Sequence, residues 1–229
     1  RGIGEVLRFG VFASGMNLLT QLGRSAPEMI IGKFSGITDV ALFSRAGGLV
    51  QLFRQLVARA VAPVCLPFFA RSVREEDSVA RAYGHAVAIF TVVGWPFVGF
   101  LAIETFPAIR LIYGAQWIAS VPLAQILCIA GCFEVLHFMA KDALLSHGNV
   151  KMASRLQLLQ QISQVLGLLA VVPFGLTGAC WGLLASSMAG AALAQWHMHS
   201  SLGWRMRDLW LACRTSTWVS AVALAPALL

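Results

Sequence analysis

The sequence predicts an all-α fold, a polytopic membrane bundle of about seven transmembrane helices. Hydrophobic residues make up 58% of the chain and charged residues only 12%, whereas about a quarter of the residues of a soluble domain are charged. No Lys, Arg, Asp or Glu occurs from Leu156 to Trp204. A backbone in lipid must satisfy its own hydrogen bonds, so apolar runs of about 20 residues become helices.

The predicted spans follow the apolar runs in chain order. They cover residues 9–33, 43–68, 84–108, 118–140, 156–173, 177–197 and 208–229. The long uncharged run crosses twice, because Pro173-Phe174-Gly175-Leu176-Thr177-Gly178 at its middle is typical of a turn. Arg214 and Pro226 make the last span the least regular.

The basic residues predict the orientation of this bundle. With the N-terminus of the chain in the cytoplasm, only Lys33, Arg45 and Arg110 of the loop cations fall on the opposite side. That asymmetry is what the positive-inside rule requires. Topology therefore accounts for the net charge of +7, and no nucleic-acid partner is expected.

Two further patterns are assigned to helix packing. Small residues recur every four positions in the sixth span, at Gly178, Gly182, Ser186 and Gly190, and permit close approach of helices. The cysteines lie in apolar stretches without the spacing of a zinc site, so we interpret them as small core residues. No metal and no cofactor is expected.

Polar side chains inside the first two spans are the candidate site. An arginine near the centre of a membrane helix costs about 2.5–3.5 kcal/mol, so Arg24, Arg54 and Arg59 should face a polar interior. The spacing of the other polar residues places them on the same helical faces. The predicted cavity-lining set is Asn17, Gln21, Arg24 and Glu28 in the first span, with Gln51, Arg54, Gln55 and Arg59 in the second.

This pattern leaves two interpretations open. The spans could enclose a water-filled or ligand-accessible cavity. Alternatively, Arg24 and Glu28 could form a structural ion pair one turn apart, with the amides holding helices together.

Other polar residues in the spans are weaker signals. Glu134 and His137 are candidate proton-relay groups, because ionisable residues in spans are often functional. A glutamine stripe in the fifth span is expected to face the bundle interior: Gln157, Gln160, Gln161 and Gln164. No catalytic motif occurs, so an enzyme is not expected.

Several short motifs, in order along residues 5–200, carry a family resemblance. They are Leu7-Arg8-Phe9-Gly10, Ile30-Ile31-Gly32-Lys33-Phe34-Ser35-Gly36, Ala41-Leu42-Phe43-Ser44-Arg45-Ala46, Leu66-Pro67-Phe68-Phe69-Ala70, Leu111-Ile112-Tyr113-Gly114 with Trp117, Leu144-Leu145-Ser146-His147-Gly148 and Pro173-Phe174-Gly175-Leu176-Thr177-Gly178. With these motifs the chain resembles the polysaccharide and lipopolysaccharide biosynthesis flippases, the O-antigen and exopolysaccharide exporters of the multidrug/oligosaccharidyl-lipid/polysaccharide superfamily.

The resemblance implies a location, a substrate and partners. The chain would be one transmembrane bundle over residues 1–229, the second half of a larger transporter in the bacterial inner membrane. It would move an undecaprenyl-diphosphate-linked oligosaccharide to the periplasmic leaflet, with the arginines facing the diphosphate. Membrane lipid, a polysaccharide polymerase and glycosyltransferases are the expected partners. A drug or cation antiporter of the same superfamily, a membrane-embedded enzyme of envelope synthesis and a structural scaffold are the alternatives.

Overall fold

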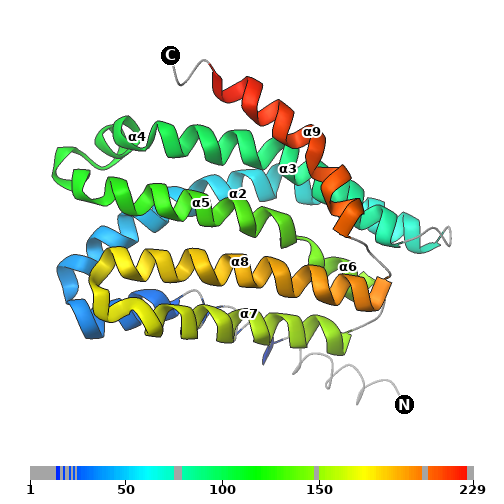
Figure 1. The fold of residues 1–229 in the computed structure, drawn as a ribbon, viewed down its shortest axis with the longest axis horizontal. Helices are drawn as coiled ribbons and strands as arrows, with labels where there is room; N and C mark the ends of the chain where they lie inside the picture. Colours follow the sequence, from blue (N-terminus) through cyan, green and yellow to red (C-terminus); the bar gives the residue numbers. More distant parts are fainter. Residues whose placement is uncertain are drawn as a thin grey trace.

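A computed structural model describes residues 14–15, 18, 21, 23, 25–74, 79–146, 150–202 and 206–225. All of the described segments are helices or their connections, which confirms the all-α class (Figure 1). After a first helix that ends at residue 35, the elements are α2 (Ile37–Arg74), α3 (Val79–Ile103), α4 (Thr105–Ile112), η1 (Ala115–Ser120), α5 (Val121–His137), α6 (Ala140–Ser146), α7 (Val150–Val171), η2 (Val172–Phe174), α8 (Gly175–Leu202) and α9 (Met206–Leu224).

The first two helices are joined by a single residue, Gly36. Its φ of 91° lies in the left-handed region, which glycine adopts without steric cost. The predicted spans 9–33 and 43–68 left a longer loop here. α2 instead extends beyond the predicted span at both ends, because polar residues such as Asp39 are compatible with a helix outside the lipid. Hydropathy therefore locates the apolar part of a helix and not its ends.

Three apolar stretches of the described helices are long enough to cross a membrane. They are Ala80–Ile103, Ala115–Leu145 and Val150–Ser201. The last contains both α7 and α8, and η2 with Gly175 at a φ of 86° forms the predicted turn between them. In Figure 1 the chain reverses at opposite ends of the bundle, with the α7–α8 turn at one end and α6 at the other. The total of seven spans stays a prediction.

The predicted spans 84–108 and 118–140 are each interrupted. α3 ends at Ile103, and the short helix α4 follows after Glu104. α5 ends at His137, and α6 begins at Ala140 after a two-residue turn at Phe138 and Met139. The apolar stretch continues through that second interruption.

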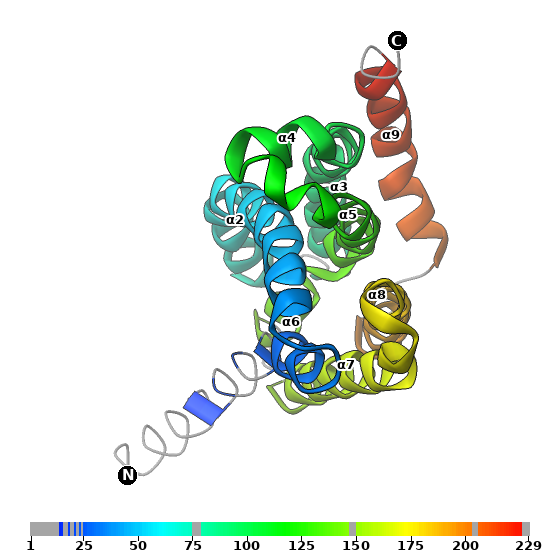
Figure 2. The ribbon, with the colours of Figure 1, turned by 90° about the vertical axis from the view of Figure 1, so that its left-hand side faces the viewer.

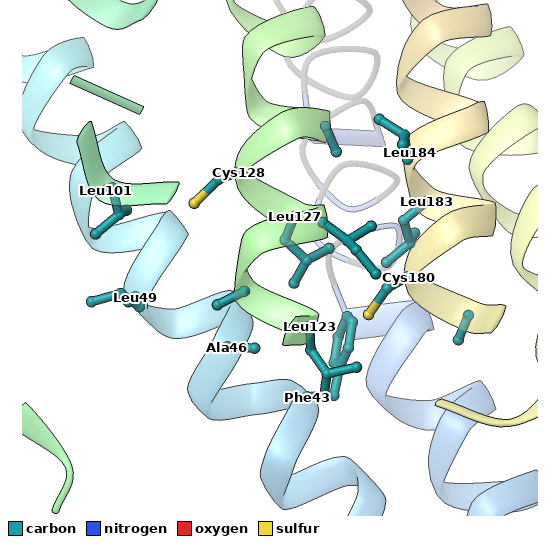
Figure 3. Packing of buried hydrophobic residues seen from close by; sticks show 14 of the residues in the cluster. Phe43, Ala46, Leu49, Leu101, Leu123, Leu127, Cys128, Cys180, Leu183 and Leu184 are labelled. Atoms are coloured by element: carbon teal, nitrogen blue, oxygen red, sulfur yellow. The ribbon is translucent and has the colours of Figure 1, made fainter. Parts of the chain in front are cut away.

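Buried apolar side chains form two clusters along the bundle. The first joins α2, the end of α3, α5 and the start of α8, and it includes Phe43, Leu123, Cys128 and Cys180 (Figure 3). The second joins the start of α3, α6, the start of α7 and the end of α8. Buried Cys128 and Cys180 are free thiols among apolar neighbours, in agreement with their interpretation as core residues.

Glycines allow α7 and α8 to pack at very short range. A Cβ atom at Gly182 would collide with the carbonyl oxygen of Gly167 and with Val171. A Cβ atom at Gly167 would lie 2.9 Å from the carbonyl oxygen of Gly182. The predicted packing role of the small-residue stripe is therefore confirmed at this contact.

Candidate functional site

A cavity of about 690 Å³ opens between the first helix, α2, α5, α6, α7 and α8. Figure 2 looks along the bundle, with α2 on one side of α5 and with α7 and α8 below. The cavity touches both apolar clusters, through Phe43 and Leu183 of the first and Leu156 of the second. The rest of its lining includes amide, hydroxyl and ionisable side chains.

The glutamine stripe of α7 forms one wall of this cavity. Gln157, Gln160, Gln161 and Gln164 all line it, so they face the bundle interior as the sequence predicted. The amide of Gln160 donates to the carbonyl of Gly190 in α8, at 3.4 Å. The carbonyl oxygen Oε1 of Gln161 is buried and has no partner among the described residues.

Two serines of α8 continue the uncharged wall. The hydroxyls of Ser186 and Ser187 donate to the carbonyl of Leu183, at 2.8 and 2.9 Å. A hydroxyl that donates keeps acceptor capacity on its oxygen. Together with the glutamines, these serines give the wall both donors and acceptors without a net charge.

Ionisable groups line the cavity from other sides. Glu28 comes from the first helix, Glu134 and His137 from α5, and Lys141 and Asp142 from α6. His137 Nδ1 lies 3.0 Å from the carbonyl oxygen of Phe133. A carbonyl oxygen can only accept, so a hydrogen bond at this contact requires a proton on Nδ1.

The structure separates the predicted site residues. Glu28 and Gln51 line the cavity. Gln21, Gln55 and Arg59 are exposed and do not appear among the described lining residues. The remaining three, Asn17, Arg24 and the side chain of Arg54, lie outside what the structure describes, as does the Arg24–Glu28 pair. The role of the whole set stays a prediction.

The sequence analysis missed part of the cavity lining. Lys141 and Asp142 were placed beyond the fourth span, and Ser186 and Gly190 were assigned to helix packing alone, yet all four line the cavity. The position of Ser186 could have been inferred, because its stripe of small residues lies beside the glutamine stripe of α7. No local signal pointed to Lys141 and Asp142, whose position depends on the turn after α5.

A separate cluster joins two of the motifs and lies outside the described cavity lining. The Arg45 guanidinium of α2 lies over the Tyr113 ring at 5.4 Å and over the Trp117 ring at 5.0 Å. These cation–π contacts attach α2 to the α4–η1 connection. They give Arg45, Tyr113 and Trp117 a structural role that explains why the two motifs occur together.

The described helices include three apolar stretches long enough to cross a membrane, and amide, hydroxyl and ionisable side chains line the cavity between them. A profile of the polysaccharide biosynthesis protein family matches residues 1–122, more than half of the 229 residues. The chain belongs to this family, which confirms the resemblance to polysaccharide biosynthesis flippases and exporters.

Two curated relatives agree with the family. The chain is 25% identical over 153 residues to the teichuronic acid biosynthesis protein TuaB of Bacillus subtilis, a match that covers 67% of the chain and 32% of TuaB. It is 23% identical over 123 residues to the succinoglycan biosynthesis transport protein ExoT of Rhizobium meliloti, covering 54% of the chain and 25% of ExoT. The chain thus spans about a third or less of the length of these relatives. No solved structure gives a significant match.

Proposed function

We propose that the chain is the second half of a flippase in the bacterial inner membrane. Its substrate is an undecaprenyl-diphosphate-linked oligosaccharide, which moves from the cytoplasmic to the periplasmic leaflet. A hydroxyl-rich head group cannot cross hydrocarbon without compensation for its lost hydrogen bonds. The observation that carries the proposal is the uncharged polar wall of the cavity, in a chain whose relatives are polysaccharide biosynthesis and transport proteins.

The wall suits a glycan because amides and hydroxyls both donate and accept hydrogen bonds, as sugar hydroxyls do. Gln157, Gln160 and Gln164 present this chemistry from α7, and Gln51 presents it from α2. The predicted arginines Arg24, Arg54 and Arg59 serve the diphosphate in the same proposal, as bidentate donors.

The test measures flipping of the lipid-linked oligosaccharide in cells that contain the full-length protein. Gln160→Leu and Gln164→Leu remove amides from the cavity wall with little change in volume. Each should reduce flipping by about fivefold or more, the effect of roughly 1 kcal/mol of lost hydrogen bonding. Gln125→Leu is the matched control, because Gln125 is exposed on α5 and does not appear in the described lining. Equal flipping by all three variants and the unsubstituted protein would reject the wall as the sugar contact.

A cation antiporter is the second candidate, and one observation favours it. The described lining carries carboxylates at Glu28, Glu134 and Asp142, against a single lysine, Lys141. An acidic cavity attracts a cationic substrate. Drug export measured with the same variants discriminates the candidates, because Glu134→Gln should abolish antiport while Gln160→Leu should not.

A further inference from the structure

Neither proline nor glycine accounts for the break between α5 and α6. Residues 134–142 read EVLHFMAKD and contain neither proline nor glycine, the residues that most often interrupt a helix. Nevertheless α5 ends at His137 and α6 begins only at Ala140. An interruption without proline or glycine has another cause, such as a side chain that competes for a backbone carbonyl.

Two buried side chains meet at a backbone carbonyl beside this break. The Tyr83 hydroxyl of α3 donates to the carbonyl oxygen of Leu136 at 3.2 Å. The Gln195 amide of α8 donates to the Tyr83 oxygen at 3.2 Å and to the Leu136 carbonyl at 3.4 Å. Tyr83 is fully buried, and Gln195 is 5% exposed. In a continuous helix the Leu136 carbonyl would accept from the amide of Ala140.

The two apolar clusters meet within α5, just before the break, where Val135 and Leu136 already pack against the second cluster. The α5 residues Leu123 to Ala130 belong to the first cluster, whereas Met139, Ala140 and Leu144 belong to the second. Phe138 in the turn packs against Phe90 of α3, with ring centroids 5.3 Å apart. The turn and α6 therefore pack within the second cluster.

Cavity-lining groups stand on both sides of the turn. Glu134 and His137 precede it, and Lys141 and Asp142 follow it. A change in the turn changes the direction of α6 relative to α5, and with it the position of Lys141 and Asp142 in the cavity. Irregular backbone at membrane depth is tolerated where it is buried in protein or lines a cavity. In this turn Met139 is buried and Phe138 lines the cavity.

We propose that Tyr83 and Gln195 are positioning residues for the transport cavity. By donating to the Leu136 carbonyl they keep the helix interrupted after His137. The resulting turn sets the direction of α6, so that Lys141 and Asp142 line the cavity. The proposal rests on the proposed function only in calling the cavity a transport site. The geometric part stands without it.

The experiment measures thiol labelling in the full-length protein in membranes. The reporter is Asp142→Cys on α6, and the reference is Ser187→Cys, on the α8 wall away from the turn. Tyr83→Phe removes one hydroxyl, and Gln195→Met removes the amide with little change in volume. Either should slow labelling of the reporter by about fivefold, the shift from one net hydrogen bond, and leave the reference rate unchanged.

The control is Thr91→Val, which removes another buried interhelical hydrogen bond of α3. The Thr91 hydroxyl lies 2.7 Å from the Ser216 hydroxyl of α9. Its other described hydrogen bonds go to carbonyls of α3 itself and not to α5 or α6. It should change neither labelling rate.

Unchanged reporter labelling in both Tyr83→Phe and Gln195→Met would overturn the proposal. Equal slowing of reporter and reference would overturn it as well, because that indicates general loosening. If neither variant reaches the membrane while Thr91→Val does, the contact is structural and the positioning role is rejected. A failure of the flippase proposal appears separately, as absent flipping in the unsubstituted protein with the labelling pattern intact.

Discussion

Adding one methyl group at Gly182 tests the close packing of α7 against α8. In Gly182→Ala the new Cβ would overlap the carbonyl oxygen of Gly167 and the side chain of Val171. A backbone carbonyl of a packed helix cannot rotate away as a flexible side chain can, so α7 and α8 must separate. Overpacking of this kind costs about 1–3 kcal/mol.

Helix propensity acts in the opposite direction and sets the net magnitude. Replacing glycine by alanine inside a helix stabilises it by up to about 1 kcal/mol. The expected result is therefore a net loss of up to about 2 kcal/mol in the free energy of unfolding. Gly47→Ala is the matched control, because Gly47 lies inside α2 with nothing within 4 Å of its added Cβ. That variant should gain stability.

The assay is thermal unfolding of the full-length protein in detergent, with both variants measured under the same conditions. The informative quantity is the sign of each change. If Gly182→Ala is as stable as Gly47→Ala, α7 and α8 do not approach at glycine range, and the close-packing argument fails.

Two further predictions concern arginines. Arg45→Ala should lower stability by about 1 kcal/mol through loss of the contacts with the Tyr113 and Trp117 rings, and Arg45→Lys should recover part of it, as unfolding in detergent can measure. In the full-length protein, Arg24→Ala and Arg54→Ala should each reduce flipping by about tenfold or more, since hydrogen bonds to charged groups contribute about 1.5–3 kcal/mol; normal insertion with unchanged flipping would contradict their assignment to the diphosphate.

Helix type and the interior-facing stripe of α7 were predictable from the sequence because both depend on local periodicity. Gln157, Gln160, Gln161 and Gln164 recur at spacings of three and four within an apolar run, and only one helical face satisfies that pattern. The η2 turn was also predictable from local sequence, because its proline and glycine restrict or relax the backbone conformation at their own positions.

The break after α5 could not be predicted, because its cause is distant in the sequence. The residues around Leu136 favour a continuous helix, and the competing donors, Tyr83 and Gln195, come from α3 and α8. Hydropathy placed one span across it, and the apolar stretch is indeed continuous there. The positions of Lys141 and Asp142 in the cavity could not be predicted either, because they depend on this turn.

The charge of the cavity decides which substrate chemistry the bundle can serve. The described carboxylates Glu28, Glu134 and Asp142 would repel a diphosphate, whereas the uncharged wall of glutamines and serines carries no charge that would repel it. A lipid-linked glycan presents both chemistries, an anionic diphosphate next to a neutral sugar. The two fit one cavity if the sugar lies against α7 and α8 and the diphosphate lies away from the carboxylates, towards the predicted arginines. Gln160→Leu should then weaken recognition of the sugar, and Arg54→Ala should weaken recognition of the diphosphate. For a substrate analogue without the glycan, flipping should therefore be unaffected by Gln160→Leu and still reduced by Arg54→Ala.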